Sequence, residues 1–187
     1  MGATFNLPNM LTAIRIALIP LLVMVFYLPP EWSNPTAAFV FAAAGLTDWL
    51  DGYLARKLGQ TSAFGAFLDP VADKLMVAVA LVLLVQANPG AYVTIPAAII
   101  IGREITVSAL REWMAQVGAG HRVTVSIFGK FKTLAQFFGI SFMLYKLDIL
   151  GLPIYKMGWV LLMISAGLTL WSMVLYLRAA WPSMRDQ

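Results

Sequence analysis

The sequence contains no cysteine and few charged residues. Without cysteine, disulfide bridges and thiolate metal sites are excluded. Asp, Glu, Lys and Arg make up only 12% of the 187 residues, whereas hydrophobic types make up 60%. Because a soluble domain is about a quarter charged, this chain has too few charges for a surface that faces water on all sides. The composition therefore predicts an integral membrane protein.

Hydrophobic segments alternate with short gaps that contain Gly or Pro. A helix needs about 20 residues to cross a bilayer, and six segments of suitable length are predicted: 8–28, 35–58, 65–86, 92–115, 127–145 and 153–179. The first is not expected to be a cleaved signal, because Arg15 interrupts its apolar run. The predicted fold is an all-α integral membrane domain of six transmembrane helices that occupies residues 1–187.

Basic residues near the segment ends predict the orientation. Those expected on one side are Arg56, Lys57, Arg111, Arg122, Lys130, Lys132, Arg178 and Arg185, whereas only Lys146 and Lys156 fall on the other. Because cytoplasmic loops carry the excess of Lys and Arg, both termini are expected in the cytoplasm. The net charge of +4 is explained by this bias, without nucleic-acid binding.

Acidic residues are concentrated in one short stretch. Of nine in the chain, four fall within 26 residues: Asp48, Asp51, Asp69 and Asp73. Asp48 and Asp51 share one face of the second predicted helix, and Asp69 and Asp73 share one face of the third. Since these helices are antiparallel across a short turn, the four carboxylates are expected to converge between them, in the cytoplasmic half of the membrane.

Converging carboxylates inside a membrane need positive charge nearby. Mg²⁺ and Mn²⁺ prefer oxygen ligands, and two such ions about 4 Å apart form a clamp for displacement at phosphorus. The alternative is ion pairing between helices, which would leave the spacing of the acids unexplained. The basic residues considered for such pairs are Arg56, Lys57, Lys74, Arg103 and Arg111.

The stretch from Asp48 to Asp73 follows the pattern D-x-x-D-G-x-x-A-R-x8-G-x-x-x-D-x-x-x-D without a departure. It resembles the signature of the CDP-alcohol phosphotransferase family. That resemblance implies a six-helix membrane enzyme that transfers a phosphatidyl group from CDP-diacylglycerol to an alcohol and releases CMP. It also implies a bacterial inner membrane location and a homodimer.

The resemblance implies a role for each signature residue. Asp48, Asp51 and Asp69 would be ligands of two Mg²⁺ or Mn²⁺ ions, and Asp73 would be both a ligand and the general base. The residues assigned to binding of CDP-diacylglycerol are Asn9, Thr12, Gly52, Ala55, Arg56 and Ser62. For Asn9 and Thr12, helix capping or packing is an equally good interpretation.

Four basic residues outside the signature predict a pocket for an acceptor that carries its own phosphate: Arg103, Arg111, Lys130 and Lys132. An arginine near the middle of a span, such as Arg103, suggests an anionic ligand or a water-filled cavity, although the two lysines also fit a topological anchor. The stretches 6–15, 102–112 and 129–136 resemble those of bacterial family members that use glycerol 3-phosphate. This implies phosphatidylglycerophosphate as the product.

Other interpretations remain open at this point. The acceptor could be inositol phosphate, serine or phosphatidylglycerol, and intramembrane acids also occur in divalent-cation transporters. A purely structural membrane protein would leave the four carboxylates without a purpose. The lone His121 is expected in a loop without a catalytic role. Aromatic residues near span ends are interpreted as interfacial anchors: Tyr27, Trp32, Trp159, Trp171, Tyr176 and Trp181.

Overall fold

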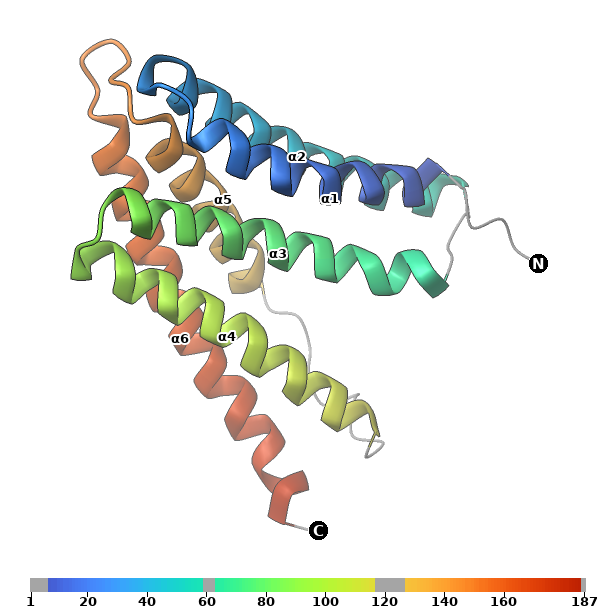
Figure 1. Ribbon diagram of the computed structural model, residues 1–187. Coiled ribbons are helices and arrows are strands. Elements are labelled where there is room, and N and C mark those ends of the chain that lie inside the picture. The colour runs from blue at the N-terminus through green and yellow to red at the C-terminus, as the bar shows by residue number, and fades with distance from the viewer. Residues whose placement is uncertain (1–6, 59–62, 117–126, 186–187) are drawn as a thin grey trace.

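The structure is a computed structural model that describes residues 7–58, 63–116 and 127–185 (Figure 1). Over these ranges the chain forms six α-helices, as predicted. They are α1 (Leu7–Phe26), α2 (Pro30–Leu58), α3 (Ala63–Ala87), α4 (Ala91–Gln116), α5 (Ile127–Tyr145) and α6 (Ile154–Arg185). The all-α prediction is confirmed.

Two helix boundaries differ from the predicted ones. The sequence 33–35 was expected to be a turn before the second helix, but α2 already begins at Pro30 and contains Pro35. Proline is favoured at the first helical position, where its missing N–H would have no partner in any case. In addition, the Ser33 hydroxyl donates to the Phe26 carbonyl at 2.9 Å, which ties this first turn to the end of α1. The last helix is longer than expected and extends to Arg185.

The helices run alternately up and down, so that the connections α1–α2, α3–α4 and α5–α6 lie at one end (Figure 1). α1 packs against α2 and α3, α6 packs against α4 and α5, and α2 joins the two groups through α5. Towards the opposite end, α1–α3 diverge from α4 and α6 (Figure 1).

Most buried polar residues are concentrated in one half of this bundle. Most of the large, fully buried apolar side chains lie where the helices converge: Leu22, Leu81, Leu84, Ile100, Ile140, Met143, Leu144 and Leu162, whereas Met114 lies near the divergent end of α4. Most buried polar side chains lie towards the divergent end: Asn9, Thr12, Arg15, Asp51, Lys132, Gln136, Ser165 and Thr169. Burying polar groups is costly unless they are paired, so their concentration in one half indicates a functional region.

Two glycines allow a close crossing of α5 and α6. A Cβ atom added at Gly139 would lie 2.9 Å from the backbone nitrogen of Leu162, and one added at Gly158 would lie 2.8 Å from the carbonyl oxygen of Gly139. The backbones of α5 and α6 therefore touch at this point. Small residues at such crossings are typical of helix packing in membranes.

Three helices are long and apolar enough to cross a bilayer: the segments 9–26 in α1, 91–116 in α4 and 154–178 in α6. This result concerns length and composition within the described part of the chain. It supports a protein that spans the membrane several times.

Candidate active site

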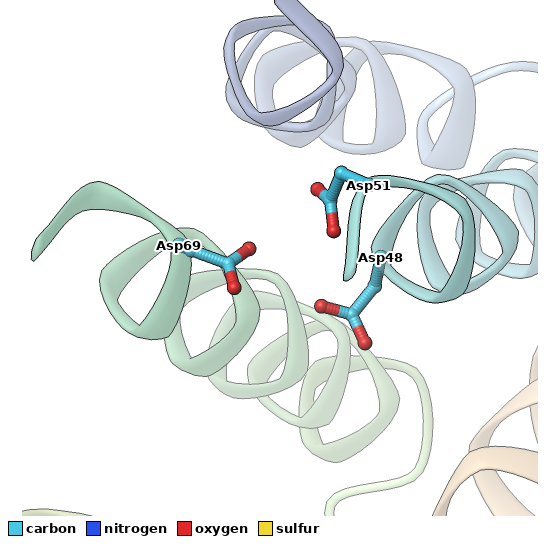
Figure 2. A group of neighbouring side chains, drawn as sticks. All are labelled: Asp48, Asp51 and Asp69. Carbon is cyan, nitrogen blue, oxygen red and sulfur yellow. The ribbon is translucent and has the colours of Figure 1, made fainter. Parts of the chain in front are cut away.

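Three acidic side chains converge between α2 and α3. Asp48 and Asp51 come from α2 and Asp69 from α3, and one carboxylate oxygen of each lies within 4.8 Å of the others. Figure 2 shows the three carboxylates directed towards one another. The Asp51 side chain is buried, whereas the side chains of Asp48 and Asp69 are 45% and 41% exposed. We call these three residues the acidic group.

A buried arginine from α1 contacts all three members of the acidic group. Nη1 of Arg15 lies 2.8 Å from Oδ1 of Asp48 and 2.8 Å from Oδ1 of Asp69. Nη2 of Arg15 donates to Oδ2 of Asp51 at 2.5 Å. The Arg15 side chain is only 1% exposed. The ion pairs predicted as an alternative involved five other basic residues, so Arg15 was not predicted as the partner of these carboxylates.

Asp73 follows Asp69 by one helical turn on α3 and is exposed. It is not one of the three side chains that form the acidic group among the described residues. The charges of Asp48, Arg15, Glu104 and Asp69 nevertheless act on it.

The residues assigned to CDP-diacylglycerol are only partly described. Asn9 and Thr12 on α1 are 8% and 3% exposed, and they precede Arg15 on the same buried face. Gly52, Ala55 and Arg56 belong to α2, but their side chains lie outside the described part of the structure. Ser62 lies outside the described residues altogether.

Three of the four predicted basic residues form one cluster between α4, α5 and α6. Glu104 accepts from Nη1 of Arg103 at 2.5 Å and from Nζ of Lys132 at 3.4 Å. The Lys132 side chain is buried, and the charges of Arg103 and Arg111 act on it. Lys130 precedes Lys132 by two residues on α5, and its side chain lies outside the described part of the structure.

Tyr176 of α6 connects two of these basic side chains. Nη2 of Arg111 lies 2.6 Å from the Tyr176 phenol oxygen, and its guanidinium carbon lies 5.2 Å from the ring centroid. The Arg103 guanidinium lies 6.0 Å from the same centroid. A guanidinium within about 6 Å of an aromatic ring is attracted by its electron-rich face. Tyr176 therefore belongs to the basic cluster, which we define as Arg103, Glu104, Arg111, Lys132 and Tyr176.

Sequence reasoning assigned no site role to Arg15, Glu104 or Tyr176. A signal existed for Arg15, since an arginine within an apolar run needs a partner. Glu104 follows Arg103 directly and offered the same kind of signal. Tyr176 carried no signal, because aromatic residues near the ends of spans are common as interfacial anchors.

The acidic group fits a divalent metal ion. Its side chains offer oxygen atoms only, which suits Mg²⁺ or Mn²⁺. In the structure one oxygen of each of these carboxylates already contacts a cationic group, the guanidinium of Arg15. The acidic group thus binds a cation, and the basic cluster is suited to bind an anion.

The fold and the site together define a class of protein. It is a helical membrane protein with a site of carboxylate oxygens beside a basic cluster. The family model described as CDP-alcohol phosphatidyltransferase matches residues 5–171, and the chain belongs to this family. The resemblance predicted from Asp48 to Asp73 is confirmed.

Curated relatives match nearly the whole chain. A Pseudomonas fluorescens protein is 54% identical over 183 residues, which cover 96% of this chain and 92% of the relative. An Escherichia coli (strain K12) protein is 49% identical over 183 residues, with 98% and 99% covered. A Shigella flexneri protein has the same identity and coverage. Each relative is named CDP-diacylglycerol--glycerol-3-phosphate 3-phosphatidyltransferase.

Proposed function

We propose that this protein transfers the phosphatidyl group of CDP-diacylglycerol to sn-glycerol 3-phosphate, with phosphatidylglycerophosphate and CMP as products. The observation that carries the proposal is the convergence of the carboxylates of Asp48, Asp51 and Asp69 between α2 and α3. The same protein also holds Arg103, Arg111 and Lys132 in one basic cluster, which suits an anionic acceptor. Family membership and the names of the relatives support the same reaction.

In this proposal all six helices span the inner membrane of a bacterium, and both termini lie in the cytoplasm. The supporting features are the alternating helices and the excess of Lys and Arg at one set of helix ends. The acidic group then faces the cytoplasm, where a water-soluble acceptor is available. Residues 1–187 form a single domain, and a homodimer is expected from the family resemblance.

The donor binds at the acidic group. When bound there, two Mg²⁺ or Mn²⁺ ions supply positive charge that neutralises the donor pyrophosphate. Asp48, Asp51 and Asp69 would hold these ions, and we assign Asp73 as a further ligand. Arg56 binds a phosphate oxygen of the CDP moiety through its forked guanidinium. Gly52, Ala55 and Ser62 contact the same moiety, and Asn9 and Thr12 close the site from α1.

Asp73 takes the proton of the acceptor hydroxyl. The hydroxyl oxygen attacks the phosphorus that carries diacylglycerol, and a new P–O bond forms. The bond from this phosphorus to the bridging pyrophosphate oxygen breaks, and its electron pair leaves with CMP. Charge and atoms balance, because the proton remains on the Asp73 carboxylate until it is released to water.

The basic cluster binds the phosphate of the acceptor. Arg103, Arg111 and Lys132 gather around Glu104 and Tyr176, and Lys130 on α5 is assigned to the same task. Guanidinium groups bind phosphate oxygens in pairs and so fix orientation as well as charge. A neutral acceptor such as serine would leave this cluster unused.

The experiment that tests the proposal is an acceptor panel. Purified protein in detergent receives CDP-diacylglycerol, Mg²⁺ and one of four alcohols: glycerol 3-phosphate, glycerol, serine or inositol phosphate. We expect CMP release with glycerol 3-phosphate only. Glycerol is the matched control, because it lacks only the phosphate. Release with inositol phosphate or serine instead would overturn the acceptor, and no CMP with any alcohol would overturn the enzyme proposal.

A further inference from the structure

We infer that Arg15 is the built-in counter-ion of the acidic group and competes with the divalent metal for the same carboxylates. This inference rests on the proposed metal site. It concerns a residue of α1 that has no part in the signature between Asp48 and Asp73.

Arg15 contacts every member of the acidic group. A single guanidinium reaches Asp48, Asp51 and Asp69, with distances of 2.8, 2.5 and 2.8 Å to one oxygen of each. These three residues are the same ones whose oxygens lie close enough together to hold a metal ion. Arg15 thus occupies the position of a cation with respect to all three ligands.

The Arg15 side chain is both buried and charged. The Arg15 side chain is 1% exposed, and a guanidinium is not deprotonated in proteins. Its charge is therefore permanent, and removing it would leave three neighbouring carboxylates to repel one another. In the metal-free protein, Arg15 keeps α1, α2 and α3 together at this end of the bundle.

The sign of the effect on metal binding follows from Coulomb's law. Arg15 and a divalent ion are both positive and share the same carboxylates, so each opposes the binding of the other. The carboxylate contacts with Arg15 must loosen as the metal binds. Arg15 therefore lowers the metal affinity of the site while it stabilises the metal-free form.

The test measures metal binding and stability rather than turnover. Wild-type protein, Arg15→Gln and the control Lys156→Gln are purified in detergent and stripped with EDTA. Mn²⁺ binding is then followed through the electron paramagnetic resonance signal of free Mn²⁺. Gln has a similar reach without the charge, and Lys156 is an exposed residue in the first turn of α6. We expect Arg15→Gln to bind Mn²⁺ at least about tenfold more tightly than wild type, and Lys156→Gln to be unchanged.

Thermal unfolding gives the second measurement. Without metal, Arg15→Gln is expected to unfold at a lower temperature than wild type, and Mn²⁺ is expected to raise its unfolding temperature by more than it raises that of wild type. This larger shift is the linked consequence of tighter binding. Equal or weaker Mn²⁺ binding by folded Arg15→Gln would overturn the inference.

Two further outcomes remain decisive. If Arg15→Gln does not fold, Arg15→Met takes its place, because Met is a long side chain that carries no charge. Arg15→Met is then expected to bind Mn²⁺ more tightly than wild type, and equal or weaker binding refutes the competition. Absence of saturable Mn²⁺ binding by wild type would instead overturn the proposed metal site on which the inference rests.

Discussion

The phenol oxygen of Tyr176 lies 2.6 Å from Nη2 of Arg111, which joins α4 and α6 across 65 positions of the chain. Both Arg103 and Arg111 also lie against the face of the Tyr176 ring. One neutral side chain thus fixes two cations whose mutual repulsion would otherwise separate them. In the proposed reaction, this arrangement holds the basic cluster ready for the acceptor phosphate.

Replacing Tyr176 with Phe removes the hydrogen bond and keeps the ring. A hydrogen bond of this kind contributes about 0.5–1.5 kcal/mol, so the KM for glycerol 3-phosphate should rise about two- to thirteenfold. Because the donor site and Asp73 are untouched, kcat and the KM for CDP-diacylglycerol should change little. Steady-state measurement of CMP release at varied acceptor concentration checks this split.

Tyr155→Phe is the matched control on the same helix. The Tyr155 hydroxyl has no hydrogen-bond partner within the described part of the chain, and the residue lies in the first turn of α6. Its loss should leave both KM values unchanged. A fall in kcat alone for Tyr176→Phe would contradict a role in acceptor binding.

The helices were largely predictable because each depends on a local property of the chain. Hydrophobic length and Gly or Pro punctuation placed all six within a few residues, apart from the start of α2 and the end of α6. At Pro30 the pattern was ambiguous, because a proline both ends one helix and suits the first turn of the next.

The acidic group was also predictable, since helical spacing places Asp48 and Asp51 on one face and a short turn brings Asp69 back to them. The partners from distant helices were not. Spacing along a helix tells which residues share a face, but not which other helix that face meets. Arg15 and Tyr176 joined the site through the packing of α1 against α2 and α3 and of α6 against α4.

Replacing Asp73 with Asn should abolish turnover and largely spare binding of CDP-diacylglycerol. The amide keeps the shape of the carboxylate but cannot take the proton of the acceptor hydroxyl, and general base catalysis contributes about 10²–10⁴-fold. CMP release gives the rate, and equilibrium binding of the CDP-lipid gives the donor affinity. Asp148→Asn, in the connection between α5 and α6, serves as the control and should retain full activity. Retained activity of Asp73→Asn would refute the base assignment.

Removal of metal should stop the reaction completely. Four neighbouring carboxylates and a pyrophosphate cannot share one site without divalent cations, because Arg15 supplies only one positive charge. We expect no CMP release after EDTA treatment and recovery with Mg²⁺ or Mn²⁺. Asp69→Asn should raise the Mg²⁺ concentration needed for half-maximal activity by about tenfold or more, since one ligand loses its charge. A rate that EDTA does not affect would contradict a metal-dependent site.

Gly158→Ala should destabilise the protein through the crossing of α5 and α6. The added Cβ would lie 2.8 Å from the carbonyl oxygen of Gly139 and 2.9 Å from the backbone nitrogen of Met143, so the two helices must separate. Overpacking of this kind costs about 1–3 kcal/mol, which exceeds the gain of up to about 1 kcal/mol from the higher helix propensity of Ala. Thermal unfolding in detergent measures the effect. Gly167→Ala is the control on the same helix, because a Cβ there meets nothing within 4 Å and only the propensity gain remains. If both variants unfold at the wild-type temperature or above it, the backbones of α5 and α6 do not touch at Gly158.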